Sequence, residues 1–292
     1  MQPIGEIGAK KFGRIEDPKF SILIPSWNNK AFLQLCIESI QKNSVFQHQI
    51  IVHVNDGSDG TLELLEAQRI DHTFSAENVG ICYALNAAAN ISSSDILVYM
   101  NDDMYVCPDW DKAIVDEIKA IGHDRFFLAS TMLEPRSSGN PCVIAPFEAG
   151  TDPASFNEEK LLNEFNIEQI ADKQGTTWPP SVMHKRMWDL VGGMSVEFSP
   201  GMYSDPDLCM KLWMAGVRYF KGLSRSRVYH FQSATTLRIK KNDGKKQFLN
   251  KWKVSASYFV NEILERGKDW IGPLPDKSIE APLKDKVKRM VP

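Results

Sequence analysis

The residues best suited to chemistry lie where an apolar run ends in carboxylates. Residues 96–100 are all apolar or aromatic, and Asn101, Asp102 and Asp103 follow directly. The run predicts a buried strand, and ligands bind beyond the carboxyl ends of strands in open α/β sheets. Adjacent carboxylates repel one another unless a cation binds them, and hard divalent cations prefer oxygen ligands. The stretch therefore indicates a metal-diphosphate site, with an ordinary polar turn as the alternative.

Composition and charge narrow the classes of function. The chain has 292 residues, which suits one large domain or two small ones. Its 43% hydrophobic and 24% charged residues are ordinary for a soluble globular protein. The net charge of −3 gives no reason to expect a nucleic-acid partner. Residues 233–292 nevertheless hold 14 Lys and Arg against 7 Asp and Glu. This basic tail indicates an anionic partner, with a solvated surface as the alternative.

The pattern of cysteines and the length of apolar runs indicate the cellular compartment of the protein. The five cysteines are scattered, odd in number and free of any CxxC pair, so neither a disulfide framework nor a zinc site is expected. A reducing compartment fits this pattern. Residues 1–19 lack the apolar core of a signal peptide, and no run reaches the ~18 apolar residues needed to span a membrane. We therefore expect a cytoplasmic protein, either soluble or peripheral on the inner face of the membrane.

Strands and helices alternate in the first part of the chain. Apolar runs rich in strand formers predict strands, and helical spacing of apolar residues predicts helices between them. The expected strands are 20–24, 50–54, 70–74 and 96–100, and the expected helices are 31–43, 61–68 with Thr61 as its cap, and 81–89. This alternation implies βαβ units with right-handed crossovers and a parallel sheet.

The pattern is looser after residue 103. We expect helices at 110–121, 158–170 and 205–215, strands at 126–133 and 227–231, and a loop at 134–152. Residues 181–190 lead into the helix stop Gly192-Gly193. Apolar residues on one side of 246–266 predict a single amphipathic helix. We expect residues 1–19 to form a loosely attached arm and residues 272–292 a poorly ordered tail.

Several motifs follow one another in a familiar order. They are FSILIPSWN at 20–28, VNDGSDGT at 54–61, NVG at 78–80, MNDD at 100–103, VGGM at 191–194, DPDLCMK at 205–211 and VYHFQSAT at 228–235. This order resembles family 2 glycosyltransferases over about residues 20–255. The resemblance implies a GT-A fold, which is an α/β fold with a Rossmann-like, mostly parallel central sheet flanked by helices. It also implies sugar transfer from a nucleotide-sugar donor.

The resemblance also divides the chain. A GT-A catalytic domain would span 20–232, with a nucleotide-binding half at 20–103 and an acceptor half at 104–232. The arm at 1–19 would precede it, and a basic C-terminal extension with the amphipathic helix would follow at 233–292.

The donor residues implied by the resemblance lie mostly in polar turns. Asp56 would accept the N–H of a uracil-like base, which favours a UDP-sugar; a turn cap is the alternative. The other donor-binding residues would be Pro25, Ser26, Trp27, Asn28, Asn78, Gly80, Asn86, Asn101 and Asp102. Of these, residues 25–28 would line the base and ribose, while Asn78 and Gly80 would allow close approach of the backbone.

The resemblance implies a divalent metal. Asp103 matches the last carboxylate of the family's DxD element, and His230 matches a distal metal ligand; a structural histidine is the alternative. Mn²⁺ or Mg²⁺ there would neutralise charge that builds up on the departing nucleoside diphosphate. Asn101 stands where the family has the first Asp, which would weaken metal affinity.

The resemblance makes Asp205 the general base that deprotonates an acceptor hydroxyl. Asp205 opens a predicted helix, so an N-terminal cap is its alternative role. The family usually has Glu where Ser204 stands. In-line attack opposite the diphosphate would invert configuration at the anomeric carbon. Trp178, Gly193 and Asp207 would shape the acceptor and sugar pocket, and core packing is the alternative for Trp178.

These features predict a metal-dependent, inverting, non-processive glycosyltransferase. It would move one sugar to a hydroxyl of a saccharide or lipid-linked acceptor, in glycan or surface polysaccharide biosynthesis. The alternative is a catalytically inactive, nucleotide-sugar-binding partner subunit, which Asn101 and Ser204 would permit. A nucleotidyltransferase would need a glycine-rich basic loop that residues 25–29 do not provide. A homodimer is a further possibility, as is contact of Lys240, Lys241, Lys245 and Lys246 with anionic lipid.

Overall fold

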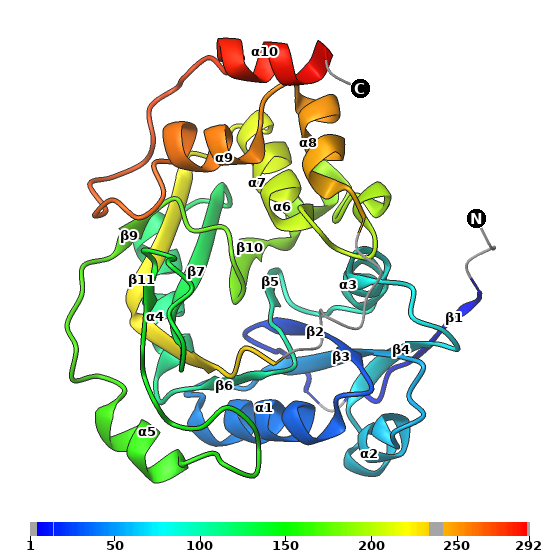
Figure 1. Cartoon of the computed structure of the whole chain (residues 1–292). Helices are drawn as coiled ribbons and strands as arrows, with labels where there is room; N and C mark the ends of the chain where they lie inside the picture. The colour runs from blue at the N-terminus through cyan, green and yellow to red at the C-terminus, as the bar shows by residue number, and fades with distance from the viewer. Residues whose placement is uncertain (1–4, 14, 234–241, 291–292) are drawn as a thin grey trace.

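The computed structural model of the chain describes residues 5–13, 15–233 and 242–290. These residues form one mixed sheet in the order β1-β4-β3-β2-β5-β10-β7-β11-β6, with β8 beside β7 and β9 beside β11 (Figure 1). The strands are β1 (Ile7–Lys10), β2 (Ser21–Trp27), β3 (Gln49–Asn55), β4 (Asp71–Ser75), β5 (Ile96–Tyr99), β6 (Met104–Val106), β7 (Phe126–Leu133), β8 (Val143–Ile144), β9 (Lys173–Gln174), β10 (Ser181–His184) and β11 (Tyr219–His230).

Helices cover both faces of this sheet (Figure 1). They are α1 (Lys30–Asn43), α2 (Thr61–Gln68), α3 (Ile81–Asn90), α4 (Trp110–Ile121), α5 (Glu158–Glu164), α6 (Lys185–Val191), α7 (Ser204–Met214), α8 (Gly244–Trp252), α9 (Ala256–Tyr258) and α10 (Leu283–Met290), with the short turns η1 (Val196–Phe198) and η3 (Phe259–Ile263). The predicted α/β class with a central sheet between helices is therefore confirmed.

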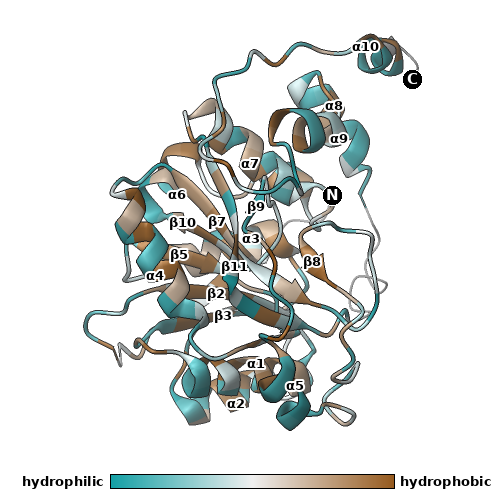
Figure 2. Cartoon of the chain, turned by 90° about the vertical axis from the view of Figure 1, so that its left-hand side faces the viewer, coloured by the Kyte–Doolittle hydropathy of each residue, from teal (hydrophilic) through white to brown (hydrophobic). Residues whose placement is uncertain are grey.

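The predicted alternation of strands and helices in the first part of the chain is confirmed, in the order β2-α1-β3-α2-β4-α3-β5. β2 pairs in parallel with β3 and β5, and β3 pairs in parallel with β4. Neighbouring residues of β2 point to opposite faces, so Leu23 joins one apolar cluster and Ile22 and Ile24 join the other. Burial on both faces explains the continuous apolar runs seen in the sequence, and the central strands are correspondingly brown in Figure 2. Beyond β5 the sheet is mixed, because β10 runs antiparallel to both β5 and β7.

One carboxylate anchors the starts of two helices. Asp59 accepts a hydrogen bond from Lys30 N at 2.8 Å, in the first turn of α1. It also accepts from Thr61 N at 3.1 Å and Thr61 Oγ1 at 2.6 Å, at the start of α2. The prediction that Thr61 caps α2 is wrong, because Thr61 is already helical and its hydroxyl is used as a donor to Asp59. The loop after β3 is thus held against both helices.

Several element boundaries predicted in the second half are wrong. The strand expected at 227–231 is β11, which begins at Tyr219 and has 12 residues. The early part of β11 contains a buried cation. Lys221 pairs with Glu117 at 2.8 Å and with Asp172 at 3.0 Å. Because these ion-pair partners are distant in the sequence, the polar residues at the start of β11 gave no signal of a buried strand. The helix expected at 158–170 ends at Glu164, and β8 lies inside the loop expected at 134–152.

The single helix expected at 246–266 is broken. α8 ends at Trp252, and Lys253 takes a left-handed conformation with φ 67°. Ser255 then accepts from Tyr258 N at 3.3 Å and starts α9. The break lets Phe248, Phe259 and Ile263 enter the same apolar cluster as α7. Tertiary burial therefore outweighs the helical period of this segment.

The described parts of residues 1–19 and 272–292 contain more regular structure than expected. β1, within the predicted loose arm, pairs antiparallel with β4 and forms an edge of the sheet. In the predicted disordered tail, Leu274 is 5% exposed and α10 forms over its last part. A hydrogen bond of 2.7 Å from Ser255 N to Asp285 Oδ2 ties α10 to the start of α9. No helix in the described ranges is both long and apolar enough to cross a bilayer.

We predict that Asp59→Ala costs more stability than the loss of a single helix cap. Removing a cap typically costs ~1 kcal/mol, so the doubly used Asp59 should cost about 2 kcal/mol in the free energy of unfolding measured with urea. The matched control is Asn157→Ala, which removes one cap bond to Lys160 N at 2.9 Å and should cost about 1 kcal/mol. Equal effects of the two variants would contradict the double role of Asp59.

Candidate functional site at the carboxyl ends of the parallel strands

The predicted donor residues gather around the ends of β2, β3 and β5. Trp27, the last residue of β2, lies opposite Asn55, the last residue of β3. Asn28 follows β2 and donates from Nδ2 to Asp56 Oδ2 at 2.8 Å and to Ser58 Oγ at 3.0 Å. The bond from Asn28 is the main reason that the pKa of Asp56 lies below its ordinary value. Asp56 is thus an exposed, ionised acceptor held in one orientation.

Asp102 fastens the turn after β2 to the end of β5. Its carboxylate is buried and accepts from Ser26 Oγ at 2.7 Å and from Asn29 Nδ2 at 3.0 Å. Asn101, next to it, is partly exposed, and its side-chain amide makes no hydrogen bond within the described part of the chain. Of the two, Asn101 is the one whose side chain is available to a ligand.

Asp103 and His230 face each other across β6 and β11. These strands pair antiparallel with His230 opposite Met104, which places His230 Nε2 3.5 Å from Asp103 Oδ1. Ser233 N donates to the other oxygen, Asp103 Oδ2, at 2.8 Å. Burial alone would raise the pKa of Asp103, but His230 and Ser233 outweigh burial and hold the pKa below its ordinary value. The motif residues Ala234 and Thr235 lie outside the described residues.

Glu134 completes this arrangement, and sequence reasoning missed it. It directly follows β7, is 3% exposed, and its Oε1 lies 2.8 Å from His230 Nδ1. Gln232 Nε2 donates to its other oxygen at 2.8 Å. Burial would lower the pKa of His230, but Asp103 and Glu134 together raise it to about 9. The sequence signal that could have identified Glu134 is its position directly after the apolar run of β7, since Asp103 was identified from a similar position after residues 96–100.

The Asp103–His230 pair fits a cation shared with a diphosphate better than a closed protein cage. Two ligands of an octahedral ion, each about 2.1 Å from it, lie about 3 Å apart at right angles, close to the 3.5 Å seen here. Residues 5–13, 15–233 and 242–290 contain no group of three or more His, Cys, Asp or Glu side chains suited to a metal. Mg²⁺ commonly uses one or two protein ligands together with substrate phosphates. Binding would displace the His230 proton, because only neutral imidazole ligates.

Asp205 lies in the first turn of α7 and is half-buried. Burial raises its pKa to about 7, and no hydrogen bond or cation within the described part of the chain opposes this effect. At the end of β5, burial first, and then nearby negative charges that include those of Asp205, Asp103 and Asp102, raise the pKa of Tyr99. A carboxylate whose pKa is near 7 is suited to general-base work.

Two contacts join α3 to the segment between α6 and α7. Asn86, within α3, forms a two-way bond with Met194: its Nδ2 donates to Met194 O at 2.9 Å, and its Oδ1 accepts from Met194 N at 2.8 Å. Gly193 permits this approach, since a Cβ there would overlap Asn86 and lie 2.9 Å from the Trp188 ring. Gly80, held by Asn78 Oδ1 at 2.9 Å, packs against Pro200 just before α7. Asn86, Asn78 and Gly80 thus position the Asp205 helix.

Two predicted pocket residues lie in packed surroundings. Asp207 is fully buried and binds Trp252 Nε1 at 2.7 Å and Lys251 Nζ at 2.9 Å, which ties α7 to α8. Trp178 is half-buried, packs against the apolar cluster on the α1 and α4 side of the sheet, and carries the Arg266 guanidinium 4.5 Å from its ring centre. Asp205 belongs to α7, whose buried apolar residues join the cluster on the other side. The core-packing alternative considered for Trp178 agrees with this placement.

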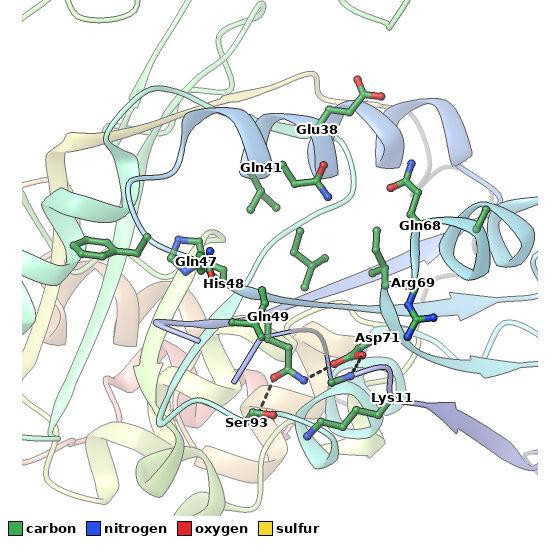
Figure 3. Close-up of a pocket in the computed structure, with 17 residues that line it drawn as sticks. Lys11, Glu38, Gln41, Gln47, His48, Gln49, Gln68, Arg69, Asp71 and Ser93 are labelled. Carbon is green, nitrogen blue, oxygen red and sulfur yellow. Dashed lines mark hydrogen bonds between the residues drawn. The ribbon is translucent and has the colours of Figure 1, made fainter. Parts of the chain in front are cut away.

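A cavity of about 1030 Å³ lies at the opposite edge of the sheet, at the amino ends of β3 and β4 (Figure 3). Its wall includes Lys11, Gln49, Arg69 and Asp71. Gln49 donates to Asp71 at 2.7 Å, and Phe12 N of the arm donates to the same carboxylate at 2.6 Å. None of the predicted donor, metal or acceptor residues lines this cavity. The candidate site is therefore the polar edge formed by β2, β3, β5 and α7.

The chain thus combines parallel strands β2 to β5, a mixed sheet beyond β5 and carboxylates at the strand ends. Residues 21–131 match the family model described as glycosyl transferase family 2. An uncharacterized glycosyltransferase, YfnE, of Bacillus subtilis is 34% identical over 96 residues, which are 31% of this chain and 24% of YfnE. An uncharacterized glycosyltransferase of Haemophilus influenzae is 24% identical, and the match covers 66% of this chain and 61% of that protein. Escherichia coli chondroitin synthase is 24% identical, and the match covers 85% of this chain and 33% of the synthase.

A solved structure shares the fold. S. aureus TarS 1-349 in complex with UDP-GlcNAc has a TM-score of 0.53 and 16% identity, over 84% of this chain and 74% of that one. This chain spans between 24% and 61% of the three curated relatives. The predicted relationship to family 2 glycosyltransferases with the GT-A fold is confirmed by these matches.

We predict that Gly193→Ala destabilises the protein more than Gly192→Ala. Both glycines have positive φ, 60° and 73°, so both variants carry the backbone cost of about 1–2 kcal/mol. Gly192 has open space around its Cβ position, whereas Gly193 is crowded by Asn86 and Trp188. Overpacking should add about 1–3 kcal/mol for Gly193→Ala, measured by urea unfolding. A smaller loss for Gly193→Ala than for Gly192→Ala would contradict the close approach of Gly193 to α3.

Proposed function

We propose that this chain is a metal-dependent, inverting glycosyltransferase that adds one sugar from a nucleotide-diphosphate sugar to an acceptor hydroxyl. The observation that carries the proposal is Asp205 in the first turn of α7, with a pKa raised to about 7 and no compensating partner within the described residues, together with the Asp103–His230 pair at 3.5 Å. A binding protein has no need of a half-buried carboxylate that is kept basic, whereas a transferase needs such a group to accept a proton.

The donor residues suit a UDP-sugar. Asp56 would accept the base N–H from its fixed orientation beside Asn28, with Pro25 to Trp27 along the base and ribose. Asp103 and His230 would hold Mn²⁺ or Mg²⁺ against the diphosphate, where the ion would offset charge on the leaving group. The TarS structures named for complexes with UDP and with UDP-GlcNAc support this choice by their shared fold.

The transfer would be a single displacement. The acceptor hydroxyl gives its proton to the Asp205 carboxylate while its oxygen forms a bond to the anomeric carbon. The bond from that carbon to the diphosphate oxygen breaks at the same time, and the nucleoside diphosphate leaves with the electron pair. Attack opposite the leaving group inverts the configuration, through an oxocarbenium-like state of the kind known from glycoside hydrolysis.

The competing proposal is an inactive nucleotide-sugar-binding subunit. It rests on Asn101, the neutral residue of the DxD-like element, and on Ser204, which is 2% exposed and donates to Gly201 O at 2.7 Å. A thermal-shift screen of nucleotide sugars with Mn²⁺, followed by turnover assays on saccharide and lipid-linked acceptors, separates the two. Ligands that bind the folded state raise the melting temperature. Binding without turnover on any acceptor would favour the inactive subunit.

The setting of the reaction is inferred from the same resemblance. A saccharide or lipid-linked acceptor, glycan or surface polysaccharide biosynthesis, a cytoplasmic location and a homodimer belong to the proposal. The name of the chondroitin synthase relative agrees with polysaccharide chemistry. Lys245 and Lys246 are exposed on α8, while Lys240 and Lys241 lie outside the described residues.

We predict that Asp205→Asn lowers kcat/KM by about 10²–10⁴-fold, the usual contribution of a general base. The wild-type kcat/KM should rise as pH increases through about 7, because only ionised Asp205 accepts the proton, and it should fall below that pH. Asp189→Asn is the control, since Asp189 is an exposed residue that pairs with Lys185 at 2.7 Å. Donor affinity, measured by calorimetry, should hold in both variants. Unchanged turnover of Asp205→Asn would refute the base assignment.

We predict that Glu134→Gln weakens Mn²⁺ binding by about 10–100-fold, the usual effect of losing a carboxylate that orients a ligating histidine. Electron paramagnetic resonance titration of Mn²⁺ in the presence of UDP measures this directly. Asp111→Asn is the control, because Asp111 pairs with the buried His48 at 3.0 Å away from the site. Chelation with EDTA should abolish transfer. Full activity in EDTA, or equal Mn²⁺ affinity in both variants, would count against Asp103 and His230 as ligands.

A further inference from the structure

The apolar side of helix α10 faces away from the rest of the protein. Asp285 is fully buried against the start of α9, whereas Leu283 is 77% exposed and Val287 is 52% exposed. Successive helical residues are about 100° apart, so Leu283 and Val287 share one side and Asp285 lies on the opposite side. A surface helix ordinarily turns its apolar stripe to the core. Here the carboxylate faces the protein and the stripe faces away from it.

Cations flank that outward stripe. Lys284 and Lys286 lie on either side of it in the helical projection, with Lys288 and Arg289 nearer the protein. All four are exposed. The single carboxylate of the helix is occupied by the hydrogen bond from Ser255 and by Lys288 at 3.8 Å. The outer side therefore combines apolar groups with uncompensated positive charge.

The position of the helix leaves this side open. Figure 1 shows α10 at one end of the molecule, above α8 and α9, and Figure 2 shows it standing away from the sheet and its covering helices. α8 contacts α10 and carries the exposed Lys245 and Lys246 in its first turn. The strand ends with Asp205 and Asp103 are not part of this surface, so a role for α10 does not depend on the proposed transferase activity.

We propose that α10 docks the protein on an anionic lipid surface, with Leu283 and Val287 entering the headgroup–acyl boundary and Lys284 and Lys286 lying against lipid phosphates. Charge decides between the candidate occupants. A second copy of α10 would bring like cations together, and a purely apolar partner would leave them unpaired. A bilayer with anionic headgroups takes both the stripe and its flanking cations, as interfacial amphipathic helices do.

The test is co-sedimentation of the full chain with vesicles of phosphatidylcholine containing phosphatidylglycerol, compared with phosphatidylcholine alone. Wild-type protein should bind the anionic vesicles, and binding should weaken at high salt. The double variant Leu283→Ser, Val287→Ser should lose at least tenfold in partition coefficient. Replacing Lys284 and Lys286 by Ser should also lose more than tenfold, at about fivefold per cation.

The matched control replaces two apolar residues of similar exposure far from α10. Ile167 (72% exposed) and Val45 (51% exposed) follow α5 and α1, at the other end of the molecule in Figure 1, and their change to Ser should leave vesicle binding intact. Melting temperatures confirm that each variant is folded. Absence of wild-type binding to anionic vesicles overturns the proposal, as does equal binding to both vesicle types. Dimerisation that the Leu283→Ser, Val287→Ser variant abolishes, seen without vesicle binding, would assign the stripe to a second copy instead.

Discussion

The burial of neighbouring carboxylates after β5 is the constraint on which the candidate site depends. A buried carboxylate keeps its charge at the ordinary pKa only when hydrogen bonds or cations compensate it. Asp102 obtains its partners from Ser26 and Asn29, so the turn after β2 is drawn to the end of β5. Asp103 obtains Ser233 N and His230 from the other direction. Because each neighbour is satisfied by a different segment, the two halves of the fold meet at this point.

The Asp205 helix is held from both of its sides. Asn86 and Gly80 connect α3 to the loops before it, and Asp207 connects its first turn to Lys251 and Trp252 of α8. The charge of Asp207 is compensated through this connection, whereas Asp205, two residues earlier, has no such partner within the described ranges and keeps a pKa near 7. The same helical turn therefore supplies one structural carboxylate and one basic carboxylate. Their different surroundings, and not their residue type, separate the two roles.

The C-terminal region has two different surfaces. Phe248, Phe259 and Ile263 enter the core beside α7, so the first part of the predicted extension is continuous with the catalytic fold. α10 instead presents Leu283 and Val287 outward and buries Asp285. The first part supports the proposed base, while the last helix is free to contact something else. This division explains why a basic, weakly apolar end of the chain still folds against the protein.

The sequence by itself determined the alternating first half, the polar strand ends and most of the candidate donor, metal and base residues. These features depend on residues that are close together in the sequence, since an apolar run, a helical spacing or a polar turn involves only a few neighbouring positions. Tertiary structure decided the rest. Glu134 contacts His230, which lies 96 residues further along the chain. The first part of β11 could not be predicted as a strand, because the partners of its buried Lys221, Glu117 and Asp172, are distant in the sequence. The break at Lys253 and the outward side of α10 likewise depend on what is packed nearby. Burial and long-range pairing set the charge state and direction of each side chain, and no local pattern encodes them.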